Sequence, residues 1–385
     1  MKNIISKKVQ DMQPSGIRAF FDLVLGMKEV ISLGVGEPDF VTPWQIREAG
    51  ISSLEEGFTS YTSNKGLYKL RLTISNYLKN RYGLEYSPEE EILITVGVSE
   101  GLDLTLRAIV EPGDKIIVPQ PSYVSYGPVA ELAGSEVTHI DTQKTNFKLT
   151  PGLLEKHIDK NKPKAIIFNY PNNPTGVSYN KKELSQLNKV LLKHHVLCIS
   201  DEVYGDLTYD FSHTPFPTLA KAKENTMYLN GFSKAYAMTG WRVGYACGPK
   251  EIIAAMTKIH QYTIMCVSIT AQMAACEALH SGKRSLEEMK REYHRRREFV
   301  VDRFNQIGLE CKKPDGAFYA FVSIKNTGLK ALEFAEKLLK EENVAVVPGT
   351  AFGNQFDDYI RVSYASSYDN LKEALARIEK FLKKL

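Results

Sequence analysis

The chain has 385 residues, of which 43% are hydrophobic and 24% are charged, as in ordinary soluble globular proteins. Its 49 Lys and Arg residues and 45 Asp and Glu residues give a net charge of only +4, spread along the chain. This balance leaves no basic stripe, so we exclude nucleic acid as a partner. The length predicts two domains.

Features of membrane and secreted proteins are also missing from the sequence. No run of about 18 apolar residues could span a membrane, and residues 1–8 lack the apolar core of a signal peptide. The five cysteines have no CxxC spacing, so we expect neither a zinc site nor a disulfide framework. We therefore expect a cytoplasmic protein that binds no metal and does not enter a membrane.

The N-terminal part is predicted to begin with an amphipathic arm, residues 1–30. A strand then leads into a turn at Gly36, where the absence of a side chain lets backbone groups approach a ligand. Thr42, followed by proline, predicts the N-cap of a helix that runs to about Glu56. Tyr61 lies on the loop that comes next.

A buried strand at 91–97 passes directly into a helix. Gly97, Val98 and Ser99 stand at this junction, where free N–H groups at the positive end of the helix dipole are suited to an anion. The spacing is not the GxGxxG of a dinucleotide fold. The next predicted strand is followed by Tyr123 on a loop.

Two further predicted strands, at 165–168 and 196–200, end in polar residues. Asn173 lies in a loop rich in asparagine and proline, which is rigid and full of amide groups. Asp201 follows the second strand directly, and Tyr204 comes shortly after. A carboxylate at the end of a buried strand is costly unless it has a cationic partner, so Asp201 is a stronger site candidate than a surface acid.

The stretch 230–245 contains one lysine, Lys234, and eight residues later one arginine, Arg242. Apolar segments on both sides predict buried strands, so the lysine is expected near the interior. A desolvated lysine has a lowered pKa and can attack a carbonyl to form a Schiff base. The arginine is suited to a bidentate contact with a phosphate. Together they predict a site for an aldehyde cofactor that bears a phosphate.

The alternation of strands and helices up to this point predicts an α/β fold, with a mostly parallel sheet covered on both faces. Ligands of such sheets bind beyond the carboxyl ends of the strands. The candidates that lie at such ends are Gly97, Val98, Ser99, Tyr123, Asn173, Asp201 and Lys234. This coincidence predicts one shared site.

The pattern changes after about residue 283. A long helix comes first, and its apolar spacing places the arginines at 295–297 on the predicted solvent face. Strands at 316–322 and 359–364 and two more helices follow. This part is predicted to be a smaller α+β domain.

These motifs, in this order, resemble those of the class I aminotransferases of pyridoxal-phosphate fold type I, within the aspartate and aromatic aminotransferase subgroup. The resemblance covers essentially the whole chain. The segments that support it are 36–40, Tyr61, 171–176, 200–204, 233–234, 240–242 and 361–364. The resemblance implies a pyridoxal 5′-phosphate-dependent amino acid:2-oxo acid aminotransferase with a ping-pong mechanism.

The resemblance also implies a homodimer in which Tyr61 reaches the cofactor phosphate of the neighbouring subunit. It divides the chain into an arm (1–30), a large cofactor-binding domain (45–283) and a small domain (31–44 and 284–385). These boundaries are expectations from the family fold.

Most of the implied roles concern the cofactor ring. Lys234 resembles the lysine that forms the Schiff base and then moves the substrate proton. Asp201 would pair with the pyridine nitrogen and keep it protonated. Tyr204 and Asn173 would hydrogen-bond the ring oxygen, and Tyr123 would stack on the ring face.

The phosphate would lie on the N–H groups of Val98 and Ser99, with Arg242 in a bidentate contact. One position departs from the family pattern, because many relatives have a serine three residues before the lysine, where this chain has Gly231. The resemblance leaves two replacements for that hydroxyl, Ser233 and Ser99.

For the substrate, Arg361 matches the arginine that binds the α-carboxylate, helped by the backbone of Gly36. In aspartate-specific members of the subgroup, a lysine at the position of Ser99 binds the distal carboxylate. Its absence, with Gly16–Ile17 in the arm, favours a broad or aromatic amino acid, with glutamate and 2-oxoglutarate as the partner pair. Arg18 could restore a carboxylate contact, so an aspartate aminotransferase stays open as the alternative.

Three other functions are compatible with parts of this sequence pattern. A carbon–sulfur lyase on the same scaffold would share Lys234, Asp201 and Arg361, so the sequence separates it poorly. A ligand sensor fused to a DNA-binding module would need an N-terminal helix-turn-helix domain, for which we expect no room. A nicotinamide dehydrogenase would need the glycine fingerprint that is missing here.

Overall fold

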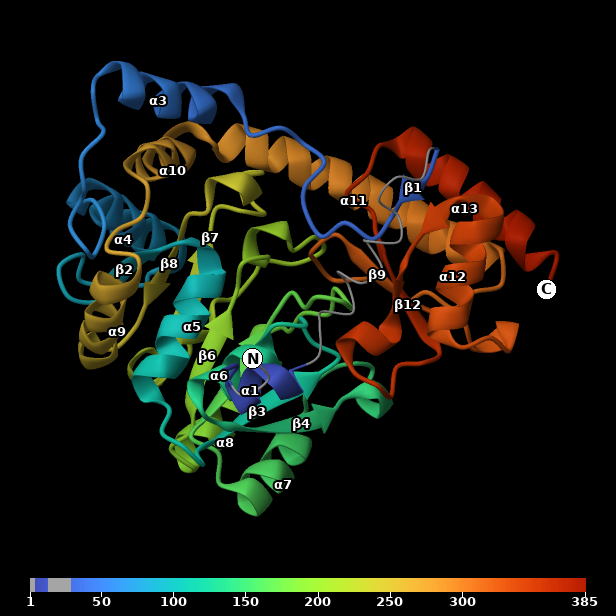
Figure 1. Cartoon of the computed structure of the whole chain (residues 1–385), viewed down its shortest axis with the longest axis horizontal. Coiled ribbons are helices and arrows are strands. Elements are labelled where there is room, and N and C mark those ends of the chain that lie inside the picture. The colour runs from blue at the N-terminus through green and yellow to red at the C-terminus, as the bar shows by residue number, and fades with distance from the viewer. Residues whose placement is uncertain (1–3, 13–28) are drawn as a thin grey trace.

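The computed structural model describes residues 4–12 and 29–385 (Figure 1). The expectations for Gly16, Ile17 and Arg18 therefore lie outside the described residues. Within the described part of the arm, a short helix α1 spans Lys7–Asp11. In the two described ranges, no helix is both long and apolar enough to cross a membrane.

A seven-stranded sheet forms the centre of the larger part of the molecule. In spatial order its strands are β2 (Ile92–Thr95), β8 (Gly244–Cys247), β7 (Thr226–Gly231), β6 (Leu197–Asp201), β5 (Ala165–Asn169), β3 (Lys115–Gln120) and β4 (Glu136–Asp141). Neighbouring strands are parallel except that β8 runs antiparallel to β2 and β7. The predicted mostly parallel sheet is confirmed.

Helices cover both faces of this sheet because successive strand residues point to opposite sides. Ile116 and Val118 pack in the cluster formed with α5 (Gly97–Ile109), α6 (Tyr126–Ala133) and α9 (Lys250–Thr263). Ile117, between them, packs in the cluster with α7 (Pro151–Asn161) and α8 (Lys181–Lys193). A capping box, Asn180 with Glu183, satisfies the first N–H groups of α8.

Three more helices pack together beside the β2 edge of the sheet: α3 (Trp44–Glu55), α4 (Tyr68–Tyr82) and α10 (Ile269–Ser281). The prediction that Thr42 is the N-cap of the first of them is wrong. Pro43 occupies that position without a side-chain cap, and the Thr42 hydroxyl instead donates to the carbonyl of Ala237. A tertiary partner has replaced the local one.

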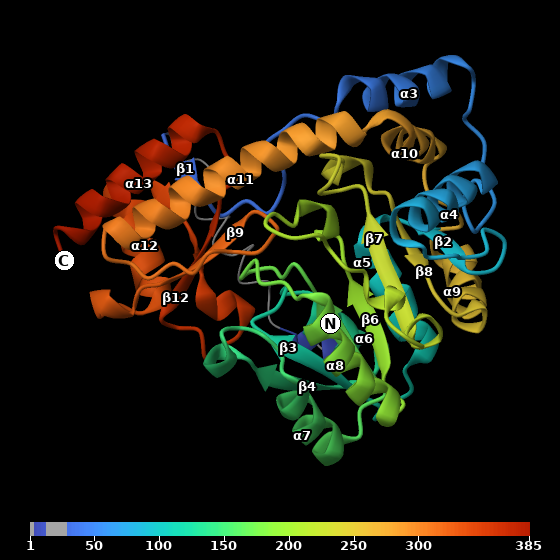
Figure 2. The same cartoon turned by 180° about the vertical axis from the view of Figure 1, so that it is seen from behind.

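The C-terminal part is connected to the sheet by the long helix α11 (Lys283–Gln306), which crosses from α10 to the C-terminal helices in both views (Figures 1 and 2). Its strands are β9 (Tyr319–Ser323), β11 (Val347–Pro348) and β12 (Tyr359–Ser363), which form an antiparallel sheet with β12 in the middle. A separate parallel pair joins β1 (Ile31–Ser32) to β10 (Val344–Ala345). Helices α12 (Ala331–Glu342) and α13 (Tyr368–Leu382) complete it.

The arginines of α11 do not all face solvent as predicted. Arg295 is exposed, but Arg296 and Arg297 are buried. Both carboxylate oxygens of Asp39 accept from the Nη1 of Arg296, at 2.8 and 2.9 Å, and Arg297 lies 2.8 Å from Asp210. Their carboxylate partners come from distant loops, which compensate the loss of hydration.

Candidate functional site

A cavity of about 1130 Å³ is lined by residues from the carboxyl ends of β5 and β6, the first turn of α5, and strands β9 and β12. Most of the sequence-predicted residues line it: Gly36, Val98, Ser99, Tyr123, Asn173, Asp201, Tyr204, Ser233, Lys234, Arg242 and Arg361. Two candidates do not. Gly97 lies against the Arg242 guanidinium without lining the cavity itself, and Tyr61 is 82% exposed on the surface.

Lys234 follows strand β7 and extends into the cavity. Its Nζ donates a 2.8 Å hydrogen bond to the carbonyl oxygen of Gly36. Burial lowers its pKa to about 8; Glu37 opposes this shift, and the positive charges of Arg242 and Arg361 reinforce it. An amine with this pKa is partly neutral near neutral pH, as a nucleophile or a base must be.

Asp201 ends strand β6 as a buried carboxylate. One oxygen accepts a 2.7 Å hydrogen bond from the Tyr126 hydroxyl, and the other accepts the N–H of Val203 at 3.2 Å. Burial raises its pKa to about 6, although these two hydrogen bonds lower it. The cationic partner expected from the sequence is not found among the described residues, so the carboxylate is suited to a cationic ligand.

The first turn of α5 and Arg242 together form an anion-binding cradle. Gly97 has φ +73°, and a Cβ there would lie 2.8 Å from the Arg242 guanidinium. The first N–H groups of a helix have no partner inside the helix, so those of Val98 and Ser99 are suited to an anion. Arg242 has φ +53°, an unusual conformation for a residue other than glycine. Its guanidinium donates to the carbonyl of Thr239 at 3.1 Å.

Arg361 lies on β12 and is only 1% exposed. Its guanidinium donates to the Asn173 amide oxygen at 2.9 Å and to the carbonyl of Gly34. Its Nε has no hydrogen-bond partner within the described ranges. Burial lowers the pKa of Arg361. A buried guanidinium held only by neutral oxygens is suited to an anionic ligand such as a carboxylate.

Two tyrosines of the site were not identified from the sequence. Tyr126 stands three residues after Tyr123, and residues three apart on a helical turn lie on one side, so this spacing could have indicated it. Tyr319 lies on β9, and its hydroxyl is 2.9 Å from that of Tyr204. No local signal in the sequence indicates that contact, because it joins residues 115 positions apart.

Packing explains why position 231 is a glycine here, although many relatives have a serine there. Gly231 on β7 pairs with Gly244 on β8. A Cβ at Gly231 would lie 3.0 Å from the Gly244 Cα and 3.3 Å from a methyl group of Val98. A serine would therefore crowd the sheet behind the anion cradle. Ser233 and Ser99, the proposed substitutes, both line the cavity.

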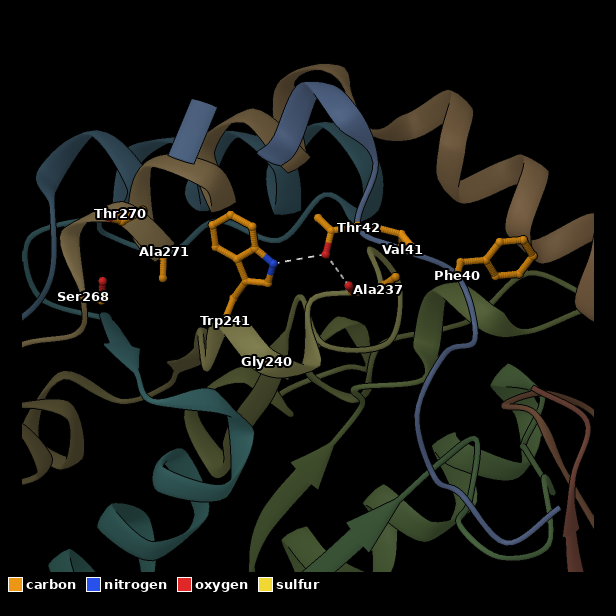
Figure 3. A pocket seen from close by; sticks show the side chains of 9 residues that line it. All are labelled: Phe40, Val41, Thr42, Ala237, Gly240, Trp241, Ser268, Thr270 and Ala271. Carbon is orange, nitrogen blue, oxygen red and sulfur yellow. Dashed lines mark hydrogen bonds between the residues drawn. The ribbon is translucent and has the colours of Figure 1, made fainter. Parts of the chain in front are cut away.

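A second cavity, of about 640 Å³, opens on the other side of the 237–242 loop. Figure 3 shows the Trp241 indole directed at Thr42, with its nitrogen donating to the Thr42 hydroxyl at 3.1 Å, and that hydroxyl donating to Ala237. Both bonds connect the start of α3 to the loop that contains Arg242. The groups joined here are neutral and paired, in contrast to the charged groups of the larger cavity.

Comparisons with known proteins agree with this geometry. Residues 28–378 match the family model of aminotransferase class I and II. The chain is 50% identical to YugH of Bacillus subtilis (strain 168), which is named as an aminotransferase without a substrate, with all of both chains covered. It is 42% identical to the aspartate aminotransferase of Pyrococcus abyssi (strain GE5 / Orsay), with 98% of each covered. The solved aromatic aminotransferase from Pyrococcus horikoshii OT3 matches with a TM-score of 0.90 at 40% identity, covering 96% of this chain and 99% of that one.

Proposed function

The chain belongs to the class I and II aminotransferases, which use pyridoxal 5′-phosphate, and we propose that the cavity around Lys234 binds this cofactor and performs the transfer. The family, fold type and cofactor expected from the sequence are confirmed. One observation supports the residue roles best: Lys234, Arg242 and Arg361 line one cavity, and no ion pair to any of them is found within the described ranges.

The residues present fit each part of the cofactor. The cradle of Gly97, Val98, Ser99 and Arg242 fits the phosphate, because a Cβ at Gly97 would fill the space beside the guanidinium. Ser233 adds a hydroxyl to the same lining. The phosphate dianion would compensate the unpaired charge of the arginine.

The ring has its own set of partners. Asp201, a buried carboxylate without a cationic partner in the described part of the chain, fits the ring nitrogen. Tyr204 and Asn173 supply hydrogen-bonding groups to the ring oxygen, and Tyr123 supplies an aromatic face. Lys234 supplies the amine that the aldehyde needs.

The chemistry divides between cofactor and chain. When bound, pyridoxal phosphate supplies an aldehyde that exchanges amines and a ring that withdraws electrons. Arg361 binds the substrate carboxylate and orients the α-carbon toward Lys234. The Lys234 Nζ, released from the aldehyde by the incoming amine, would then take the proton from that carbon, because burial lowers the pKa of this amine. Asp201 would hold the ring nitrogen and maintain its positive charge. A 2-oxo acid reverses these steps in the second half of the cycle.

For the substrate we propose a broad or aromatic amino acid, with glutamate and 2-oxoglutarate as the partner pair. The lining includes the apolar side chains of Val35, Leu102 and Val129, and it has the short Ser99 where a lysine would bind a distal carboxylate. The relatives include proteins named for aspartate and for aromatic substrates, so aspartate is the alternative. One experiment distinguishes the two substrate classes: the enzyme is mixed with single amino acids, and the visible absorption of the cofactor is followed. Fast loss with phenylalanine or tyrosine supports the proposal, and fast loss only with aspartate and glutamate overturns it.

The variant Lys234→Ala tests the type of reaction. Lys234→Ala is expected to fold and to bind pyridoxal phosphate without covalent attachment, but not to turn over repeatedly. Retained multiple turnover would show that another group is the base. Release of a thiol or of ammonia by the wild type would identify a lyase instead of a transaminase.

We also propose a homodimer with shared sites. Exposed apolar side chains lie on α3 and on the segments before and after it: Val41, Trp44, Leu54, Phe58 and Tyr61. Tyr262, in the last turn of α9, and Met265, on the loop after that helix, are also exposed, and the Asn64 side chain donates to the Met265 carbonyl. A patch of this kind on one side of a molecule is typical of an interface.

Mixing two inactive variants tests the shared site. Tyr61→Ala removes the residue proposed to cross the interface, and Lys234→Ala removes the base. A hybrid dimer of the two has one site with both residues intact, so activity is expected to return on mixing. Failure to recover activity from dimers shown to exchange subunits would contradict the shared site.

Two further assignments are part of this proposal. The chain divides into the arm (1–30), a large domain (45–283) and a small domain (31–44 and 284–385), and the separate sheets on the two sides of α11 support that division. The location is cytoplasmic, which agrees with five cysteines that are all free thiols.

A further inference from the structure

Tyr319 contacts two residues with roles in the proposed function, Tyr204 and Arg361, yet no sequence motif indicated a role for it. It is fully buried and lines the cavity. Its hydroxyl lies 2.9 Å from the hydroxyl of Tyr204, and the Arg361 guanidinium lies 4.5 Å from the centre of its ring. One side chain therefore bridges the group proposed to bind the cofactor oxygen and the group proposed to bind the substrate carboxylate.

The count of hydrogens fixes the direction of the contact between the two tyrosines. Each phenol has a single O–H to donate. If Tyr204 donates its hydrogen to the ring oxygen, only the hydrogen of Tyr319 remains to make the 2.9 Å contact. Burial raises the pKa of both phenols, so both retain their protons near neutral pH. Tyr319 then donates to Tyr204, and this makes Tyr204 a stronger donor toward the cofactor.

The ring of Tyr319 has a separate contact with the arginine. The Arg361 guanidinium lies over the rings of both Tyr319 and Phe352, at 4.5 and 5.0 Å from their centres. A guanidinium over an aromatic face is stabilised by the ring quadrupole, and more so away from water. Because Arg361 has no carboxylate partner among the described residues, these faces and two neutral oxygens define its position.

Gly36 leaves room for the Tyr319 hydroxyl. A Cβ at Gly36 would lie 3.0 Å from the Tyr319 hydroxyl oxygen but 3.9 Å from the nearest ring carbon and from the Arg361 guanidinium. An alanine there would thus press on the hydroxyl alone. The absence of a side chain at Gly36 lets Tyr319 reach Tyr204.

We propose that Tyr319 is a positioning residue with two separable contributions. Its hydroxyl donates to Tyr204 and leaves the Tyr204 hydrogen free for the cofactor, while its ring orients Arg361 for the substrate carboxylate. This inference rests on the roles proposed above for Tyr204 and Arg361.

Two substitutions separate the contributions. Tyr319→Phe removes only the hydroxyl, so the pH at which the bound cofactor changes its visible absorption is expected to rise by roughly 0.3 to 1 unit, with KM for the amino acid nearly unchanged. The rise follows because a weaker Tyr204 donor stabilises the ring oxyanion less. Tyr319→Leu also removes the ring, so KM is expected to rise roughly 5- to 30-fold.

A double substitution tests whether the hydroxyl acts through Tyr204. In a Tyr204→Phe background, adding Tyr319→Phe is expected to leave the absorption pH where Tyr204→Phe alone puts it. Equal shifts in both backgrounds would overturn the relay, and so would an unchanged pH in Tyr319→Phe alone. The matched control is Tyr179→Phe, which loses a buried hydroxyl that accepts from the Leu149 N–H and lies outside the cavity. It is expected to change neither readout.

The contact with Gly36 gives a second, independent test. Gly36→Ala is expected to lower kcat/KM more in the wild type than in Tyr319→Phe, because the shorter side chain removes the 3.0 Å contact. Equal losses in both backgrounds would contradict the inferred position of the hydroxyl. If the wild type itself gains no visible absorption with pyridoxal phosphate, the proposed function fails rather than the role of Tyr319.

Discussion

Two groups of charged side chains in this molecule have opposite surroundings. On α11, Arg296 and Arg297 are buried, but each has a carboxylate at 2.8 Å. In the cavity, Arg361 and Asp201 are as deeply buried, yet neutral groups alone make their hydrogen bonds among the described residues. Burying a charge without an opposite partner is costly. The fold itself therefore compensates the charges of the first group, whereas the charges of the second group are compensated only when ligands bind.

An unpaired cation is not sufficient evidence for a ligand site. Arg71 is also buried without an ion pair in the described part of the chain, but its guanidinium is bound by the carbonyls of Gly66 and Pro88 outside the cavity. Charges indicate a binding site where they are unpaired and also line a shared cavity. The substitutions below separate the two kinds of charge, because one kind should affect stability and the other activity.

The largest expected effect is on stability. Arg297→Ala removes the side-chain donor to the buried carbonyl of Pro314, and it removes one cationic partner each from Asp210 and Glu298, which keep contacts with Lys313. Because the truncation also leaves a cavity in place of a fully buried side chain, we expect the free energy of unfolding to fall by about 3–5 kcal/mol. Chemical denaturation measures this loss, and kcat/KM of the folded enzyme should not change. Normal stability with impaired catalysis in this variant would show that Arg297 serves the site, as the unpaired charges of the cavity do, and not the fold.

Arg361→Met should show the reverse behaviour. Loss of the guanidinium removes the carboxylate contact, which corresponds to about 2–5 kcal/mol, or roughly a 30- to several-thousand-fold fall in kcat/KM. The cofactor-free protein should be no less stable, because an uncompensated buried charge has been replaced by an apolar side chain. Steady-state kinetics and denaturation of the same preparation test both parts. A large stability loss with normal kinetics would show that Arg361 stabilises the fold and does not bind the substrate.

Asp201 gives a pH test of the same idea. Its pKa is raised from 3.8 to about 6, so the folded cofactor-free protein binds this proton more tightly than the unfolded chain. The associated stability is complete below pH 3.8 and is lost as the pH rises through 6. Relative to Asp201→Asn, the wild type should thus lose on the order of 3 kcal/mol between pH 4 and 7.

Denaturation of both cofactor-free proteins across this pH range measures the difference. Bound pyridoxal phosphate should abolish it by supplying a cation to the carboxylate. A difference that stays flat with pH would show that Asp201 already has a partner.

The smallest expected effect is at the neutral contacts beside the site. Thr42→Val leaves the Trp241 indole N–H without its acceptor, at a cost of about 1–3 kcal/mol in stability. Thr42→Ser retains the hydroxyl and should restore most of the loss. Because these groups are uncharged and paired, the affinity for pyridoxal phosphate should stay close to that of the wild type. A large loss of affinity in Thr42→Val, absent in Thr42→Ser, would make this contact part of the phosphate cradle.

Local periodicity was sufficient to predict the larger sheet and the residues at its strand ends. Asp201 and Lys234 follow short apolar runs that indicate buried strands, so their place beyond the sheet could be derived from neighbours in the sequence. The resemblance added Arg361, which follows no comparable signal.

What could not be predicted depends on contacts between distant segments. Arg297 faces inward because Asp210 reaches it from another loop, and helical spacing alone cannot indicate this. The Thr42 hydroxyl prefers the Ala237 carbonyl to its own helix. Tyr319 meets Tyr204 only once β9 has been placed beside the cavity. Tertiary partners determined the outcome at each of these positions.

The most direct test concerns Lys234. Borohydride treatment of the enzyme saturated with pyridoxal phosphate fixes the cofactor to the amine that binds it, and peptide mass spectrometry then identifies that residue. We expect a single modified peptide, with the cofactor on Lys234, and no such modification in Lys234→Ala. Stoichiometric modification of another lysine, or none at all, would contradict it.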